Sequence, residues 1–276
     1  MASTAIPLSE RPLAERAFIA LNRRANTEAR YPVVLLDQDI EALDDATGGR
    51  RKSHDALRQL TADGRLRQVR RGAYVLGTPT GGTDARLLAI LDAVTPRPYL
   101  VTAGRALAET GLSDQHFFRV IVLSTRRLAA WSWQGEQVHY VESARDRIWG
   151  ELGPDGPAIA RPERAILDCL ADRRFGVSLQ QTAEAIDRAV RMGVPVSRLA
   201  KAARRYETAA VSRRLGFLVE LLVGAAAAAP LLKLRGSSNR YVALSPFQPA
   251  SGPTDSTWRV HVNVAPELLL AHRITG

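Results

Sequence analysis

The chain has 276 residues, of which 38 are Lys or Arg and 28 are Asp or Glu, so its formal net charge is +10. This length allows two domains, and the charge favours an anionic partner, nucleic acid before a membrane surface. A single cysteine, Cys169, excludes an internal disulfide, and the longest apolar stretch, residues 221–232, is shorter than the roughly 20 residues that span a bilayer. Because the sequence also starts without a signal-peptide pattern, we expect a cytoplasmic protein with no membrane partner.

The first 80 residues predict a helix, a second helix, a turn, a third helix and a hairpin. The first helix should start near Ser9 and end near Arg24, and residues 32–36 should be extended. Asp37 is placed to cap the second helix, and residues 47–49 form the turn that follows it. This order of elements is that of a winged helix-turn-helix, in which the last helix enters the major groove and the hairpin lies against phosphates.

The third helix and the hairpin carry most of the local charge. Leu57 and Leu60 are three residues apart, so they share one helix face that can be buried. Gly64 can end the helix in the left-handed conformation, and Gly72 marks the hairpin turn. Residues 46–76 hold eight basic side chains against the two acids Asp55 and Asp63, which is the electrostatic pattern of a polyanion-binding surface.

We therefore predict double-stranded DNA as a partner and two groups of contact residues. The helix would contribute Arg50, Arg51, Lys52, Ser53, His54 and Arg58, with Arg51, Ser53, His54 and Arg58 as candidates for contacts to base edges. The hairpin would contribute phosphate contacts from Arg67, Arg70 and Arg71. The alternative interpretation is a solvated basic face without a ligand.

Residues 77–83, with one proline and three glycines, predict a linker between domains 1–80 and 81–276. Beyond it we expect helices over residues 83–94 and 101–112, strands over 118–124 and 138–141, a long helical region from residue 162, and closing strands over 241–244 and 258–264. The fold class is therefore mixed α+β, with a helix-rich C-terminal domain. That domain has a second basic cluster, read either as another polyanion surface or as a solvated helix face. Its members are Arg198, Lys201, Arg204, Arg205, Arg213 and Arg214.

No pattern in the sequence predicts catalysis. The five histidines are scattered without a metal-ligand spacing, and neither a nucleophile elbow nor a phosphate-binding loop is found. The Gly236-Ser237 pair invites comparison with nucleotidyltransferases, but no acid follows it before Asp255 to hold the metal ions that phosphoryl transfer needs. We expect a protein that is not an enzyme and that needs no metal or cofactor.

The ordered set of motifs resembles the AbiEi antitoxins of type IV toxin–antitoxin systems, and the richness in Ala and Arg is typical of an actinobacterial member. The matching segments are residues 57–60, 64–66, 69–74, 162–168, 213–220, 244–246 and 258–264. The resemblance implies a winged helix that binds inverted repeats upstream of its own operon and represses it. It also implies a C-terminal domain that counters a nucleotidyltransferase-like toxin without a stable complex. Two alternatives stay open: a ligand-responsive transcription factor with no antitoxin role, and a DNA-targeted nuclease.

Overall fold

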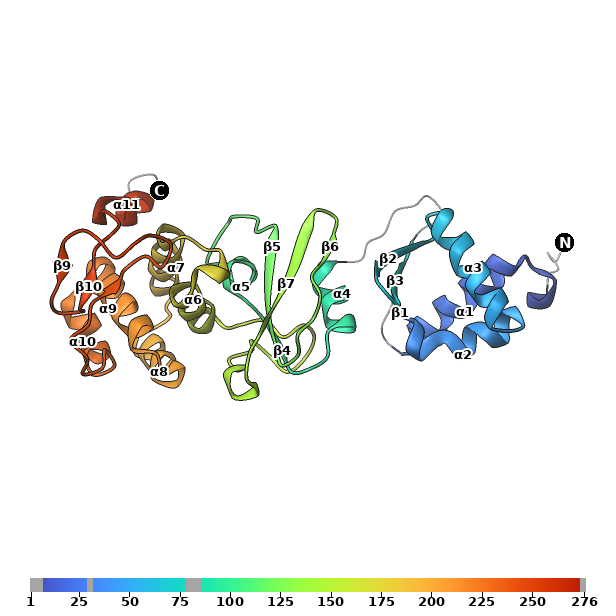
Figure 1. Cartoon of the computed structure of the whole chain (residues 1–276), viewed down its shortest axis with the longest axis horizontal. Helices are drawn as coiled ribbons and strands as arrows, with labels where there is room; N and C mark the ends of the chain where they lie inside the picture. The colour runs from blue at the N-terminus through green and yellow to red at the C-terminus, as the bar shows by residue number, and fades with distance from the viewer. Residues whose placement is uncertain (1–6, 29–31, 78–85, 274–276) are drawn as a thin grey trace. The chain divides into compact units, whose positions relative to one another are not determined.

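The computed structural model describes residues 7–28, 32–77 and 86–273 and shows a mixed α+β fold (Figure 1). The chain divides into two compact units: Met1–Pro96 with Trp131–Gln134, and Arg97–Ala130 with Gly135–Gly276. The predicted linker lies outside the described residues except for Gly77, as does the predicted boundary between residues 80 and 81. The first unit therefore extends beyond the predicted domain to Pro96.

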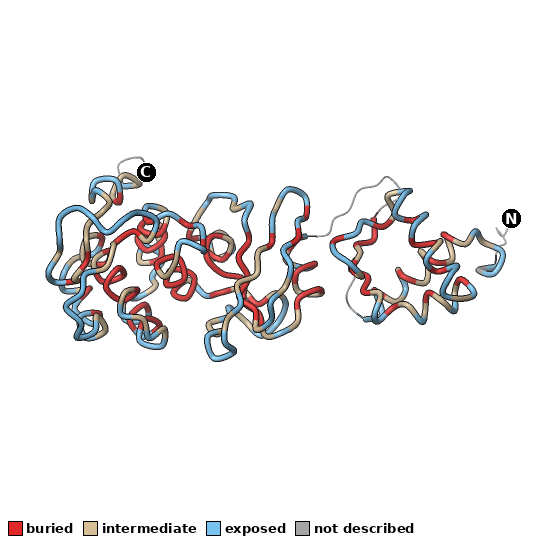
Figure 2. The backbone as a smooth tube through the Cα atoms, in the orientation of Figure 1, coloured by how far each residue is buried: buried red, intermediate tan, exposed pale blue. Residues whose placement is uncertain are grey.

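The first unit has the topology of a winged helix-turn-helix. A sheet of order β1-β3-β2, antiparallel throughout, accompanies three helices whose buried residues (red in Figure 2) alternate with exposed ones. The helices are α1 (Leu13–Thr27), α2 (Leu36–Thr47) and α3 (Arg50–Ala62), and the strands are β1 (Val33–Leu35), β2 (Leu66–Arg70) and β3 (Ala73–Leu76). The unit also contains η1 (Leu8–Glu10), α4 (Leu87–Val94) and β6 (Trp131–Trp133).

Two predicted helix starts in this unit are wrong. The helix predicted from Ser9 is split into η1 and α1, because Pro12 is the N-cap of α1 and keeps an extended backbone. Asp37 does not cap α2; it lies exposed in the first turn. The carboxylate of the fully buried Asp39 instead accepts a hydrogen bond of 2.9 Å from the backbone amide of Leu35.

The second unit combines a sheet with a group of helices. In the sheet, β5 (Arg119–Ser124) lies between β4 (Tyr99–Thr102), which is antiparallel to it, and β7 (Glu136–Glu142), which is parallel to it. The strand β4 corrects the prediction of a helix over 101–112: only α5 (Ala103–Glu109) is helical there. All four residues of β4 are buried, and a short apolar run buried on both faces has no periodicity that separates strand from helix.

The remaining elements of this unit follow in chain order. The helices are α6 (Pro162–Ala171), α7 (Leu179–Arg191), α8 (Val196–Tyr206), α9 (Ala209–Val223), α10 (Ala225–Leu232) and α11 (Pro266–Leu270). A small sheet has the order β8-β10-β9, from β8 (Val242–Ala243), β9 (Thr254–Asp255) and β10 (Val260–His261). Short 3-10 turns are η2 (Arg145–Arg147), η3 (Arg173–Phe175) and η4 (Ala271–Arg273). In the described ranges, no helix has the length and apolar content that crossing a membrane requires.

Two of the motif segments quoted above meet in this unit. Trp258 is 1% exposed and packs against α9 at Gly216, where a Cβ atom would overlap the indole ring. The indole Nε1 donates a hydrogen bond of 2.6 Å to Glu220, one turn further along α9. These motif residues therefore hold the closing segment against α9, which is a structural role.

Candidate nucleic-acid interface

The helix α3 has one buried and one basic face. Ala56, Leu57 and Leu60 are at most 4% exposed and join the core of the first unit, as the three-residue spacing of the two leucines predicts. The other face is exposed and carries Arg50, Arg51, Lys52, His54 and Arg58. The chain then leaves α3 through Gly64, whose φ of 72° confirms the predicted left-handed ending.

The turn between α2 and α3 is held by Asp44. Its backbone carbonyl accepts hydrogen bonds from the amides of Gly48 and Gly49, at 2.8 and 2.9 Å. Both glycines have a positive φ, 85° and 118°, which glycine adopts at little cost. The carboxylate of Asp44 accepts a hydrogen bond of 2.5 Å from the hydroxyl of Ser53 and one of 2.7 Å from Nε of Arg50. The hydrogen bond from Ser53 is the main cause that keeps the pKa of Asp44 below its usual value, and Arg50 lowers this pKa further. These contacts fix the angle at which α3 leaves the turn.

Ser53 is a correction to the predicted DNA contacts. It is fully buried, and its hydroxyl is shared between Asp44 and the Oγ1 of Thr47, 2.8 Å away. Ser53 lies one turn before Leu57 on the same buried face of α3, so it cannot reach a base edge. Its role is to join the two helices.

We expect Ser53→Ala to lower the free energy of unfolding by about 1 kcal/mol, because a buried hydrogen-bonded hydroxyl is lost. The ratio of affinities for specific and random DNA should stay unchanged. Chemical denaturation and DNA titration of the full chain measure both quantities, with Ser197→Ala, an exposed serine in the second unit, as the matched control. A smaller ratio of affinities for specific and random DNA, at unchanged stability, would mean that Ser53 contacts a base after all.

The three arginines of the hairpin are exposed, as predicted, but they differ in their partners. The guanidinium of Arg67 lies 4.9 Å from the ring centroid of Trp133, a cation–π contact. Arg70 donates a hydrogen bond of 2.6 Å to the carbonyl of Val94. Arg71 lies beside Gly72, whose φ of 77° forms the hairpin turn. Arg67 and Arg70 are therefore held in place by protein contacts before any ligand arrives.

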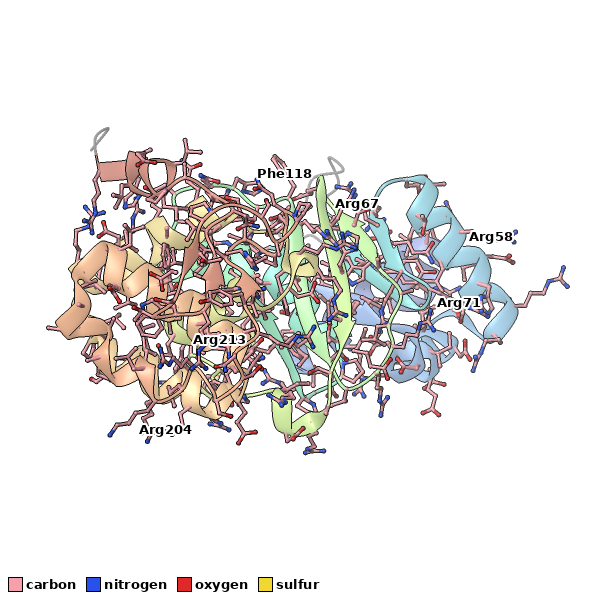
Figure 3. The ribbon with its side chains drawn as sticks, turned by 60° about the vertical axis from the view of Figure 1, so that its left-hand side comes forward. Arg58, Arg67, Arg71, Phe118, Arg204 and Arg213 are labelled. Carbon is pink, nitrogen blue, oxygen red and sulfur yellow. The ribbon has the colours of Figure 1, made fainter. Side chains whose placement is uncertain are left out.

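A groove of about 600 Å³ lies between α3 and the hairpin. Leu57 and Tyr74 give it an apolar floor, and its rim carries His54 and Arg58 from α3 and Arg71 from the hairpin (Arg58 and Arg71 are labelled in Figure 3). Arg58 also forms an ion pair with Asp55 on the exposed side of α3. The groove thus brings together the predicted helix and hairpin contacts around one concave surface.

The second basic cluster is only partly a surface. Arg198, Lys201, Arg204 and Arg205 are exposed on α8, as their spacing predicts. Arg213 and Arg214 are corrections, because Glu207 adopts a left-handed conformation that ends α8 and the next helix, α9, turns both arginines inward. They are 2% and 8% exposed; Figure 3 shows Arg204 projecting outward and Arg213 within the fold.

Backbone carbonyls satisfy these two buried guanidinium groups. Arg213 donates to the carbonyls of Arg235 and Ser238, both at 2.7 Å, and to that of Arg240. Arg214 donates to those of Leu170 and Ala243 at 2.7 and 2.9 Å. Burial lowers the pKa of both groups. They tie separate segments of the second unit together and are not available to nucleic acid.

Sequence reasoning missed Asp44 and Trp133. Asp44 could have been found, since an acid four residues before a Gly-Gly turn and nine before a serine can bond both. Trp133 is more than 60 residues beyond Arg67 in the sequence, and no local pattern links the two.

No protein-family model and no curated protein matches this chain. Among solved structures, the chain is similar to the crystal structure of the RV2827C protein from Mycobacterium tuberculosis. The TM-score is 0.71, the match covers 96% of this chain and 95% of that chain, and the sequence identity is 16%. At this identity the likeness shows a shared fold and carries no statement about function.

Proposed function

We propose that this protein is a DNA-binding transcriptional regulator that represses its own operon from inverted repeats. The observation that carries the proposal is the groove between α3 and the hairpin, whose rim holds His54, Arg58 and Arg71 on a winged-helix scaffold. In this class of protein the last helix of the motif reads the major groove and the hairpin contacts the flanking backbone. With this role we also propose a cytoplasmic location.

The exposure and the bonding partners of each side chain separate the proposed base contacts from the proposed phosphate contacts. Arg51, His54 and Arg58 are the candidates for base edges, because they are exposed in the first turns of α3. Lys52 and the hairpin arginines are assigned to phosphates, which bind any cation within reach. Arg50 forms an ion pair with Asp44, so we assign it a smaller contribution to DNA binding.

The test of this proposal is a titration of the full chain with its own upstream DNA and with random DNA of equal length. We expect tighter binding to the upstream DNA, and Arg58→Ala should reduce that preference by about 1–3 kcal/mol if the side chain contacts guanine. Arg23→Ala, an exposed arginine on α1, is the matched control and should keep the preference. Equal affinity for both DNAs would reject the assignment as a specific regulator.

We further propose that the second unit acts as an antitoxin against a nucleotidyltransferase-like toxin, without forming a stable complex and without a catalytic step of its own. This part is supported by the resemblance to AbiEi antitoxins. Co-expression with the neighbouring toxin gene tests it: the full chain should restore growth, and an Arg58→Ala variant that has lost repression should still do so. Failure of both to restore growth would leave a regulator with no antitoxin role.

The second candidate function is a transcription factor that responds to a small ligand. A cationic cavity in the second unit favours it.

A further inference from the structure

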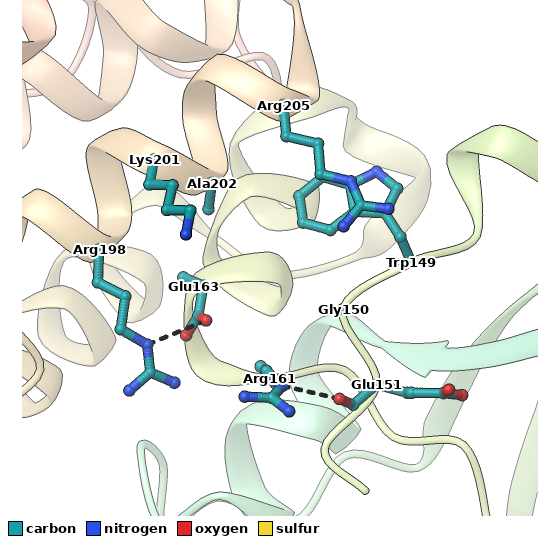
Figure 4. A pocket seen from close by; sticks show the side chains of 9 residues that line it. All are labelled: Trp149, Gly150, Glu151, Arg161, Glu163, Arg198, Lys201, Ala202 and Arg205. Atoms are coloured by element: carbon teal, nitrogen blue, oxygen red, sulfur yellow. Dashed lines mark hydrogen bonds and ion pairs between the residues drawn. The ribbon is translucent and has the colours of Figure 1, made fainter. Parts of the chain in front are cut away.

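A second cavity, of about 520 Å³, lies in the second unit between α8, the first turn of α6 and the loop at Trp149 (Figure 4). Four cationic side chains line it: Arg161 before α6, and Arg198, Lys201 and Arg205 from one face of α8. The positive end of α6 also lies there, because Arg161 is its N-cap. The volume falls in the range of small-ligand sites.

Glu163 adds a buried hydrogen-bond acceptor to this cationic cavity. The residue is 8% exposed, and its Oε1 accepts a hydrogen bond of 3.2 Å from Arg198. Its Oε2 is buried and has no hydrogen-bond partner among the described residues. Figure 4 shows the carboxylate between the side chains of Arg198 and Lys201, with Arg161 on its other side. A buried carboxylate oxygen without a partner is costly, so it is suited to accept a donor from a ligand.

The walls of the cavity are fixed before a ligand binds. Arg161 donates from Nε to the carbonyl of Glu151 at 2.8 Å, a bond that does not use its two terminal nitrogens (Figure 4). Arg205 stacks at 4.6 Å on the ring of Trp149. Gly150 has a φ of 85°, and a Cβ there would lie only 3.1 Å from the Cβ of Arg164. An adjoining cavity of about 490 Å³ shares Trp149 and Arg205, so a larger ligand could extend into it.

We propose that this cavity binds a sugar phosphate, that is, a small phosphate ester that also carries hydroxyl groups. The phosphate would lie among Arg161, Arg198 and Lys201, whose N–H groups form charge-assisted hydrogen bonds with phosphate oxygens. A sugar hydroxyl would donate to Oε2 of Glu163. A nucleic-acid strand fits less well, because its further phosphates would meet the carboxylate of Glu151.

Isothermal titration calorimetry of the full chain with ribose 5-phosphate, inorganic phosphate and ribose tests the proposal. We expect ribose 5-phosphate to bind about tenfold more tightly than phosphate, the value of one good hydrogen bond, and ribose alone to show no binding. Adenosine monophosphate distinguishes the two sources of this chemistry. If adenosine monophosphate and ribose 5-phosphate bind with equal affinity, the ligand is a free sugar phosphate. If adenosine monophosphate binds more tightly, the ligand is a mononucleotide.

Variants on α8 and α6 separate this site from surface charge in general. Lys201→Ala should weaken ribose 5-phosphate binding about tenfold or more, because one phosphate contact is lost. Arg204→Ala, an exposed arginine one turn further along α8 and outside the cavity, is the matched control and should bind normally. Glu163→Gln removes a negative charge, so phosphate affinity should be kept or raised, while the preference for ribose 5-phosphate over phosphate should fall because a neutral amide oxygen is a weaker acceptor than a carboxylate.

Three results would overturn the assignment. One is equal affinity for ribose 5-phosphate and inorganic phosphate in the unaltered protein. Another is an equal loss in Lys201→Ala and Arg204→Ala. The third is tighter binding of a short unphosphorylated oligonucleotide that Lys201→Ala abolishes, since this would identify a polyanion surface. Thermal unfolding verifies that each variant is folded, and Lys201→Ala decides the question should Glu163→Gln fail to fold.

Discussion

Replacing Arg213 with alanine should lower the free energy of unfolding of the second unit by about 3 kcal/mol or more. The guanidinium is 2% exposed and donates to three backbone carbonyls, those of Arg235, Ser238 and Arg240. Hydrogen bonds to a charged group are worth about 1.5–3 kcal/mol each, and the variant would leave the carbonyls without their donor. A loss of about 3 kcal/mol lowers the melting temperature of a domain of this length by about 6–12 °C.

Thermal unfolding of the full chain, followed by tryptophan fluorescence, measures this effect, and the buried Trp258 is a reporter in the second unit. Arg213→Lys should recover only part of the stability, because one ammonium group cannot reproduce the fork of a guanidinium. Arg204→Ala is the matched control; it removes the same charge from the surface of α8 and should change stability by at most about 0.5 kcal/mol. Equal stability of the Arg213 and Arg204 variants would mean that Arg213 is a surface residue after all.

The triple variant Lys52→Ala, Arg67→Ala and Arg71→Ala should weaken binding to DNA of any sequence by about a hundredfold at physiological salt. These side chains are exposed on α3 and the hairpin, and in the described part of the chain they have no ion pair that would compete with phosphate. Each lost phosphate contact reduces the slope of log affinity against log salt by about 0.9, so the slope should fall by nearly three units. Titrations at several salt concentrations measure it.

The control for this variant has the same change in net charge at another place. Arg126, Arg127 and Arg173 are exposed in the second unit, and their triple alanine variant should keep the salt dependence of the unaltered protein. If the two triple variants lose equal slope, net charge and not the surface of α3 and the hairpin governs binding. An unchanged slope in the first variant would remove these three cations from the interface.

The local patterns of residues 46–76 were sufficient to predict the third helix and the hairpin. Leu57 and Leu60 are buried as their spacing requires, and Gly64 and Gly72 adopt the left-handed conformations that their turns need. These features depend on contacts between residues a few positions apart, and such contacts are visible in the order of the residues. The same holds for the exposed arginines of α8.

The tertiary structure decided which polar groups are surface and which are core. Ser53, Arg213 and Arg214 are the residue types of a DNA-binding surface, but each lies on a buried face of its helix, where its partners lie in other segments. Arg67 meets Trp133, and the cavity around Glu163 joins α6, α8 and a loop. Successive side chains on a helix point about 100° apart, so the sequence determines which residues share a face, while packing determines which face is buried and which cations reach a ligand.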